Sequence, residues 1–236
     1  MATQKKESLR ERAYHSIKEE IITLKLRPGA FIDRDGLQRS LGLGITPMRE
    51  ALLQLQAENL VVLDANKGFF VKNIDFTDIS DILENRLYFE RYTAFLASVR
   101  ITQQKADDLE DYIQKNANSI TENDYTRVIF DAEVHLAIAR AANNNQLYRL
   151  MESFYTECQR IWFISQYNEG PDYAITSHLE LVTHLRNHDW ENTEKSLFEH
   201  NKKFRENVSF YFQRLLILDK SEFLASPIVA RGSDLL

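Results

Sequence analysis

The sequence is poor in residues that interrupt regular structure, with only 7 Gly and 4 Pro among 236 residues. Folds built of many short strands need such residues at regular intervals, so their scarcity favours long helices. Cysteine is scarcer still. The single Cys158 excludes an intrachain disulfide and lies within a helical pattern, so we expect a packed thiol rather than a reactive one.

Long apolar runs are also missing. No stretch reaches the length of a transmembrane helix, and the N-terminal segment lacks the apolar core of a secretory signal, so we expect a cytoplasmic protein. The hydrophobic content of 44% is nevertheless sufficient for a sizeable core. The chain is long for one compact domain, which favours two unequal domains.

An excess of positive charge is absent as well, because the formal net charge is -6. The charge is unevenly spread: residues 1–75 hold 12 Lys and Arg against 10 Asp and Glu, and the remainder holds 17 against 25. This asymmetry does not identify a nucleic-acid-binding protein by itself. The small positive excess makes the N-terminal segment the candidate for binding nucleic acid.

The first two helices of that segment are marked by their ends. A helical pattern runs from Ser8 to about Leu24 and ends at "LRPGA". The stretch "DRDGLQRSLG" follows as a short helix, with Asp33 as its N-cap and Gly42 as its terminator.

A third helix and a hairpin complete the segment. After a tight turn, Thr46 can cap a helix that has Pro47 in its first position and Glu50 reaching back to the cap. The stretch "LVVLDANKGFFVKNI" then predicts two strands joined by a turn. This order of elements indicates a winged helix-turn-helix: a helix, a short helix, a turn, a third helix and a hairpin.

In such a module the second helix of the pair enters the DNA major groove by its N-terminal end, which places Thr46, Met48 and Arg49 at the DNA. The Arg49 guanidinium can bind a phosphate or a guanine edge, and Thr46 adds a hydroxyl near the backbone. Lys67 and Gly68 in the hairpin turn form the wing, which we expect to reach phosphate or the minor groove.

From Asp75 onward the pattern is helical alone, and it predicts a bundle of antiparallel helices. The fold class is therefore mainly α. We expect three segments: a winged helix-turn-helix domain at 1–74, a helical domain at 75–218 and a C-terminal tail at 219–236. The helices are expected near residues 76–99, 103–118, 122–141, 145–166, 172–188 and 190–216.

Four chemically reactive side chains fall on apolar faces of these helices: Asp131, His135, His178 and His200. Asp131 and His135 are four residues apart and share one helix face. A single buried histidine is usually a hydrogen-bonded core residue, but a carboxylate and three imidazoles together suit a divalent metal better than a dry core. The pair His184 and His188 has polar neighbours and is expected on a solvated face. We expect His15 to lie at the surface of the first helix.

Longer stretches carry a resemblance to a known family. They are "LRPGAFI", "LGLGITPMREALLQLQAENLVV" and "NKGFFV", followed by "FDAEVHLAIARAANNN" and "SHLELVTHLRNHDWENTEKSLFEH". These residues resemble the GntR family of bacterial transcription regulators, in its FadR-type branch with an all-helical, ligand-binding FCD domain. The resemblance covers nearly the whole chain, and it implies metal ligands at the four positions named above.

The sequence departs from the family pattern in the DNA-binding segment. Members commonly carry Arg at the positions of Ile45 and Asp35, and both are used on operator DNA. Here Arg49 remains from that set, and Arg34 is displaced by one residue. The resemblance therefore implies DNA binding with an altered operator sequence.

Arg86 falls where the family often keeps an inward Arg that can pair with an acidic ligand, so it is a candidate for effector binding. The alternative is a surface salt bridge to Glu84 or Glu90.

The resemblance implies a repressor that binds a palindromic operator as a homodimer and is released by a small organic acid. The acid would bind at a divalent metal ion, with zinc, nickel and manganese as the candidates. One alternative is a metal-dependent hydrolase, although the sequence has no HExxH motif. Another is a DNA-binding regulator whose metal is purely structural.

Overall fold

The structure, a computed structural model, describes residues 7–121, 124–165 and 171–217. It divides into two compact units, Met1–Phe76 and Thr77–Leu236. The tail expected at 219–236 lies outside the described residues. Among those described, no helix has the length and apolar character that a membrane crossing requires.

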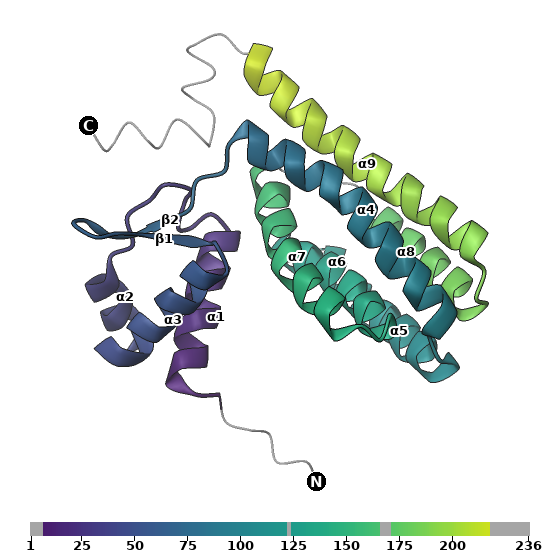
Figure 1. Cartoon of the computed structure of the whole chain (residues 1–236), viewed down its shortest axis with the longest axis horizontal. Helices are drawn as coiled ribbons and strands as arrows, with labels where there is room; N and C mark the ends of the chain where they lie inside the picture. The colour runs from purple at the N-terminus through teal and green to yellow at the C-terminus, as the bar shows by residue number, and fades with distance from the viewer. Residues whose placement is uncertain (1–6, 122–123, 166–170, 218–236) are drawn as a thin grey trace. The chain divides into compact units, whose positions relative to one another are not determined.

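The first unit contains three helices and a two-stranded sheet (Figure 1). The elements are α1 (Leu9–Ile22), α2 (Arg34–Leu41), α3 (Ile45–Ala57), β1 (Val61–Asp64) and β2 (Gly68–Val71). Ser8 caps α1 through a capping box with Glu11, and Asp33 caps α2 by accepting a hydrogen bond from the Gly36 amide at 3.0 Å. Gly42 ends α2 with φ of 63°, a region that favours glycine. This order of elements confirms the predicted winged helix-turn-helix.

The wing is a tight antiparallel hairpin in which Asp64 lies opposite Gly68. The Asp64 carboxylate accepts hydrogen bonds from the backbone amides of Asn66 (2.8 Å) and Lys67 (3.1 Å). These bonds close the turn and leave the Lys67 side chain exposed. Gly68 has φ of 103°, which a residue with a Cβ adopts only with strain.

The start of α3 differs from the sequence-based expectation. Gly44, in an extended conformation, is the N-cap, and no side chain caps the helix. Ile45 is therefore the first helical residue, so the prediction that Thr46 caps α3 is wrong. Pro47 takes the third position, where its missing N–H leaves no helical hydrogen bond unmade because the first four amides of a helix have no partner within it.

Met48 also differs from expectation. Its side chain has 0% exposure and lies on the same face of α3 as Ala51, Leu52 and Leu55, in the core of the first unit. With the helix beginning at Ile45, this spacing turns Met48 inward. The prediction that Met48 contacts DNA is therefore wrong.

The second unit is helical throughout its described residues (Figure 1). Its elements are α4 (Phe76–Arg100), α5 (Gln103–Asn116), the short 3₁₀ helix η1 (Ser119–Thr121), α6 (Asp124–Ala141), α7 (Asn145–Ser165), α8 (Pro171–Arg186) and α9 (Trp190–Ile217). One apolar core is shared by α4 to α9, and Cys158 is buried within it. Burial raises the pKa of the Cys158 thiol, which agrees with a packed and unreactive side chain.

We predict that Met48→Ala destabilises the first unit by about 2–5 kcal/mol, the usual range for removing a buried methionine side chain. Hydrogen exchange of the α1 and α3 amides in the full chain would measure it. Ile45→Ala is the matched control, since Ile45 is 71% exposed and its truncation should change stability by less than about 0.5 kcal/mol. Unchanged amide protection in Met48→Ala would contradict the inward placement.

Candidate functional site

Four side chains from three helices meet inside the second unit. Asp131 and His135 come from α6, His178 from α8 and His200 from α9, and none is more than 5% exposed. The His135 Nε2 atom lies 3.2 Å from His200 Nε2 and 3.4 Å from His178 Nε2. The Asp131 Oδ1 atom lies 3.4 Å from Nε2 of both His178 and His200, and 3.7 Å from Nε2 of His135.

This spacing fits a single metal ion. Ligand atoms held at about 2.0–2.2 Å from one ion are separated from each other by about 3 Å or slightly more. The Nδ1 atom of His178 lies 2.6 Å from the Ala174 carbonyl, which can only accept a hydrogen bond. Nδ1 therefore carries the proton, and Nε2 carries the lone pair that can bind an ion. A divalent cation would satisfy all four converging atoms.

The protonation states also suit a metal. Burial lowers the pKa of His135 to about 3, against the opposing influence of Glu90 and Asp131, so the imidazole is neutral. Burial alone would raise the pKa of Asp131. The three histidines and Arg86 outweigh burial and bring that pKa well below its usual value. A neutral imidazole and an ionised carboxylate are the forms that bind metal ions.

A second group of buried side chains supports the four ligands from α4 and α7. The Glu90 carboxylate lies 3.7 Å from Nδ1 of His135 and accepts hydrogen bonds from Arg86 (2.8 Å) and from the Tyr155 hydroxyl. The Tyr155 ring stacks on His135 with centroids 5.2 Å apart. The Glu90 carboxylate opposes the lowering of the His135 pKa by burial, and the Tyr155 ring packs against the imidazole, as outer partners of metal ligands commonly do.

Sequence reasoning did not assign Glu90 or Tyr155 to the site. Glu90 was considered only as a surface partner of Arg86, yet both side chains are 2% exposed. Their spacing of four residues on α4 puts them on one face, and that signal could have placed them together inside.

Arg86 points inward: the ion pair with Glu90 considered for it does form, but it is buried and not at the surface. Its Nη2 atom lies 3.6 Å from Oδ2 of Asp131, and its guanidinium lies over the Phe204 ring at 4.1 Å from the centroid. Glu84, the other partner considered, is exposed. Arg86 therefore joins the metal-ligand cluster to the interface between α4 and α9.

The remaining histidines lie outside the cluster. His184 is half-buried and lies 3.7 Å from the Glu180 carboxylate, and His188 is exposed with its Nδ1 atom 2.6 Å from the Ser98 carbonyl. His15 is exposed beside Glu7. None of the three is among the residues that converge on the candidate metal position.

The residues expected at DNA lie on the first unit. Arg34, at the start of α2, and Thr46 and Arg49, in the first turns of α3, are exposed. Lys67 is exposed at the tip of the wing, and Gly68 beside it is half-buried. Apart from Met48, the predicted side chains are therefore accessible to a duplex.

Comparisons with known proteins agree with this architecture. Residues 9–71 match the bacterial regulatory proteins of the gntR family, and residues 81–203 match the FCD domain. The chain belongs to the GntR family of bacterial regulatory proteins, in the branch whose C-terminal domain is an FCD domain.

Individual relatives are transcription regulators. The chain is 29% identical over 134 residues to the Nta operon transcriptional regulator of Aminobacter aminovorans, a match that covers 56% of this chain and 63% of that protein. It is 26% identical over 149 residues to the HTH-type transcriptional regulator McbR of Escherichia coli, covering 63% of this chain and 67% of McbR.

Solved structures show the same fold. The structure of E. coli McbR superposes with a TM-score of 0.73 at 23% identity, covering 88% of this chain and 98% of McbR. A GntR regulator from Rhodococcus sp. RHA1 gives 0.63 at 19% identity, covering 84% and 96%. These relatives are named as regulators and not as enzymes, which agrees with the expectation that the chain is not a hydrolase.

We predict that His178→Ala abolishes the effect of a chelator on thermal stability, whereas His184→Ala keeps it. An ion present at about 100 times its Kd stabilises the folded state by about 2.7 kcal/mol, so its removal should lower the melting temperature of the wild type measurably. Melting curves with and without chelator, together with metal analysis of each variant, measure this effect. Equal responses in the two variants would mean that the metal lies elsewhere.

Proposed function

We propose that the protein is a cytoplasmic repressor that binds a palindromic operator as a homodimer and is released by a small organic acid. The acid binds at a divalent ion, zinc, nickel or manganese, held by Asp131, His135, His178 and His200. The observation that carries the proposal is the convergence of these four buried ligand atoms in a chain whose other unit is a winged helix-turn-helix.

The exposed N-terminal end of α3 supports DNA recognition. Arg49 offers two parallel N–H donors that suit a guanine edge or a phosphate, and Thr46 lies beside it. Ile45 is 71% exposed at the first position of the helix, where it can contact a thymine methyl group. Because family members commonly have Arg at the position of Ile45, we expect the operator half-site of this protein to differ from theirs.

The homodimer is supported by the symmetry of the target and by an exposed stripe on α4. One winged helix reads one half-site, so a palindrome requires two copies of the chain. Helix α4 carries four exposed apolar side chains at spacings of four, three and four residues: Tyr88, Tyr92, Phe95 and Val99. Such a stripe on one helix face is typical of an interaction surface, and a second copy of the chain is the occupant that we propose.

The charge of the metal site supports an acidic effector. A divalent cation beside Asp131, with Glu90 and Arg86 compensating each other, leaves one positive charge in a buried region. An organic carboxylate can neutralise that charge and complete the coordination of the ion, which accepts five or six ligands in many sites. Arg86 is then a second anchor for the same acid.

We predict that Arg49→Ala strongly weakens specific operator binding without unfolding the protein. Loss of one bidentate contact to a base costs about 1–3 kcal/mol of discrimination, and the charge lost also weakens phosphate contacts. Fluorescence anisotropy with labelled operator measures the loss of specific affinity, and the same measurement with unrelated duplex measures the loss of phosphate contacts. Lys18→Ala, on α1 and paired with Glu58, is a control that should keep operator affinity. Wild-type affinity in Arg49→Ala would exclude α3 as the recognition helix.

The effector is tested by comparing metal-loaded and metal-stripped protein. An acid that weakens operator binding should be detected by calorimetry on the loaded protein and should bind the stripped protein at least 10 times more weakly. Operator affinity should fall by about 10- to 100-fold on saturation, the usual range of coupling between two sites. Equal binding of the acid to both forms would make the metal purely structural.

A further inference from the structure

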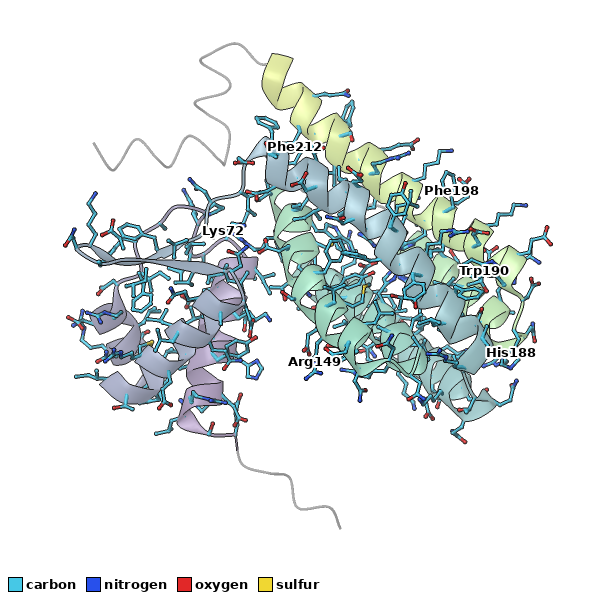
Figure 2. All side chains as sticks on the ribbon, in the orientation of Figure 1. Lys72, Arg149, His188, Trp190, Phe198 and Phe212 are labelled. Atoms are coloured by element: carbon cyan, nitrogen blue, oxygen red, sulfur yellow. The ribbon has the colours of Figure 1, made fainter. Side chains whose placement is uncertain are left out.

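The short segment before α2 forms the outer edge of the wing sheet. The Ile32 amide donates a hydrogen bond to the Phe69 carbonyl at 2.9 Å, and this bond pairs the segment with β2. The Val71 amide donates to the Ala30 carbonyl at the same distance, 2.9 Å. In Figure 2, Lys72 marks the end of β2 away from the wing turn. Because the segment runs antiparallel to β2, the chain enters α2 at the end of the sheet that carries the turn.

Phe31, within this segment, lies on the outer face of the sheet. Neighbouring residues of a strand point to opposite faces, so Ile32 is fully buried while Phe31 is 54% exposed. The Phe31 ring meets the Phe70 ring edge to face, with centroids 5.5 Å apart. Val62, opposite Phe70 on β1, is 49% exposed. The outer face therefore carries a row of apolar side chains, one from each strand, as interaction surfaces do.

Phe31 is close to two cationic residues that we expect at DNA. Arg34 follows it by three residues, in the first position of α2. A Cβ built on Gly68 would lie 3.3 Å from Cε2 of Phe31, and Gly68 directly follows Lys67 in the wing turn. The side chains of Arg34 and Lys67 are both exposed. The apolar row is therefore continuous with the expected DNA-binding surface, and a DNA strand is the occupant that this continuity favours.

We propose that the Phe31 ring packs against a deoxyribose of the bound DNA strand, beside the phosphates that Arg34 and Lys67 contact. The C–H groups of the sugar are its apolar part, and proteins bound at the minor groove use Phe side chains for apolar contacts. This inference rests on the proposed function, because it requires the winged helix to bind DNA. The sugar is the same in every nucleotide, so the contact adds affinity for any sequence. It neutralises no phosphate and releases no counterion, so it adds nothing to the salt dependence of binding.

The test measures the affinity of the full-length chain for a mixed-sequence duplex by fluorescence anisotropy over a range of salt concentrations. Phe31→Ala should weaken binding by about 5- to 10-fold at each concentration, because the exposed half of a Phe side chain no longer becomes buried. The slope of log affinity against log salt should stay at the wild-type value. Lys67→Ala, in contrast, should reduce that slope by about 1. Unchanged affinity in Phe31→Ala, or a slope reduced as in Lys67→Ala, would overturn the proposal.

A second variant keeps the test valid if removal of the ring loosens the hairpin. Phe31→Lys places a cation at the proposed contact, so a nearby phosphate should steepen the salt slope by about 1, an effect that loss of folding cannot produce. Val62 provides the matched controls, since it is exposed on the same face but separated from Phe31 by β2. Val62→Ala should change affinity by less than about twofold, and Val62→Lys should leave the slope unchanged. An unchanged slope in Phe31→Lys, or equal effects at the two positions, would overturn the proposal.

Hydroxyl-radical footprinting gives a direct result at the sugar. The radical cleaves DNA by removing deoxyribose hydrogens, so a covered sugar is protected. On a sequence selected from a random pool, the wild type should protect at least one sugar per half-site that Phe31→Ala leaves exposed, while the rest of the footprint remains. An identical footprint in the two proteins would overturn the proposal.

The two proposals fail in different ways. If Phe31→Ala loses the sugar contact but no palindrome is selected or no acid releases the DNA, the contact stands and the repressor function falls. If the wild type binds a palindrome and Phe31→Ala binds it equally well, the repressor function stands and the role of Phe31 falls. If the wild type binds no duplex even at low salt, both fall.

Discussion

The helical unit depends on one arrangement, in which three imidazole nitrogens and a carboxylate oxygen point at a common position in a region closed to solvent. The converging imidazole nitrogens lie 3.2–3.4 Å apart, and the buried Asp131 charge needs a counterion. A divalent cation would bind all four atoms and supply that counterion. Because the four side chains come from α6, α8 and α9, an ion bound there would hold three helices together.

The side chains that contact the four candidate ligands come from two further helices, α4 and α7. Glu90 on α4 approaches His135, Tyr155 on α7 donates to Glu90, and Arg86 lies between Glu90 and Asp131. An acid of the kind proposed above, bound at this cluster or at Arg86, would therefore change contacts on several helices at once. A ligand that favours one arrangement by 10- to 100-fold supplies about 1.4–2.7 kcal/mol of coupling, which is sufficient for regulation.

Most of the architecture follows from local sequence signals. The caps at Asp33 and Gly42 and the turn before Gly68 mark the ends of elements, so the winged helix could be predicted from them. The four candidate ligands could also be predicted, since each lies on an apolar helix face. The start of α3 could not be predicted. Thr46 suits the capping position and Pro47 the first helical position, but the extended backbone of Gly44 makes Gly44 the cap and Ile45 the first helical residue.

Tertiary packing explains what sequence reasoning missed. Met48 is near the exposed end of α3, which suggested a DNA contact, but its spacing of three, four and seven residues from Ala51, Leu52 and Leu55 places it on their buried face. Glu90 and Asn201 are polar residues that are ordinarily exposed, and only the meeting of α4 with its neighbours buries them. An apolar pattern does not predict buried polar side chains, although the four-residue spacing of Arg86 and Glu90 places these two on one face of α4.

The most direct measurement of the central claim is X-ray absorption spectroscopy of the protein loaded with zinc or nickel. The account predicts one ion per chain, bound by three imidazole nitrogens, with oxygen as the remaining ligands and no sulfur. Fewer than three imidazoles, or an ion present well below one per chain after loading, would contradict it.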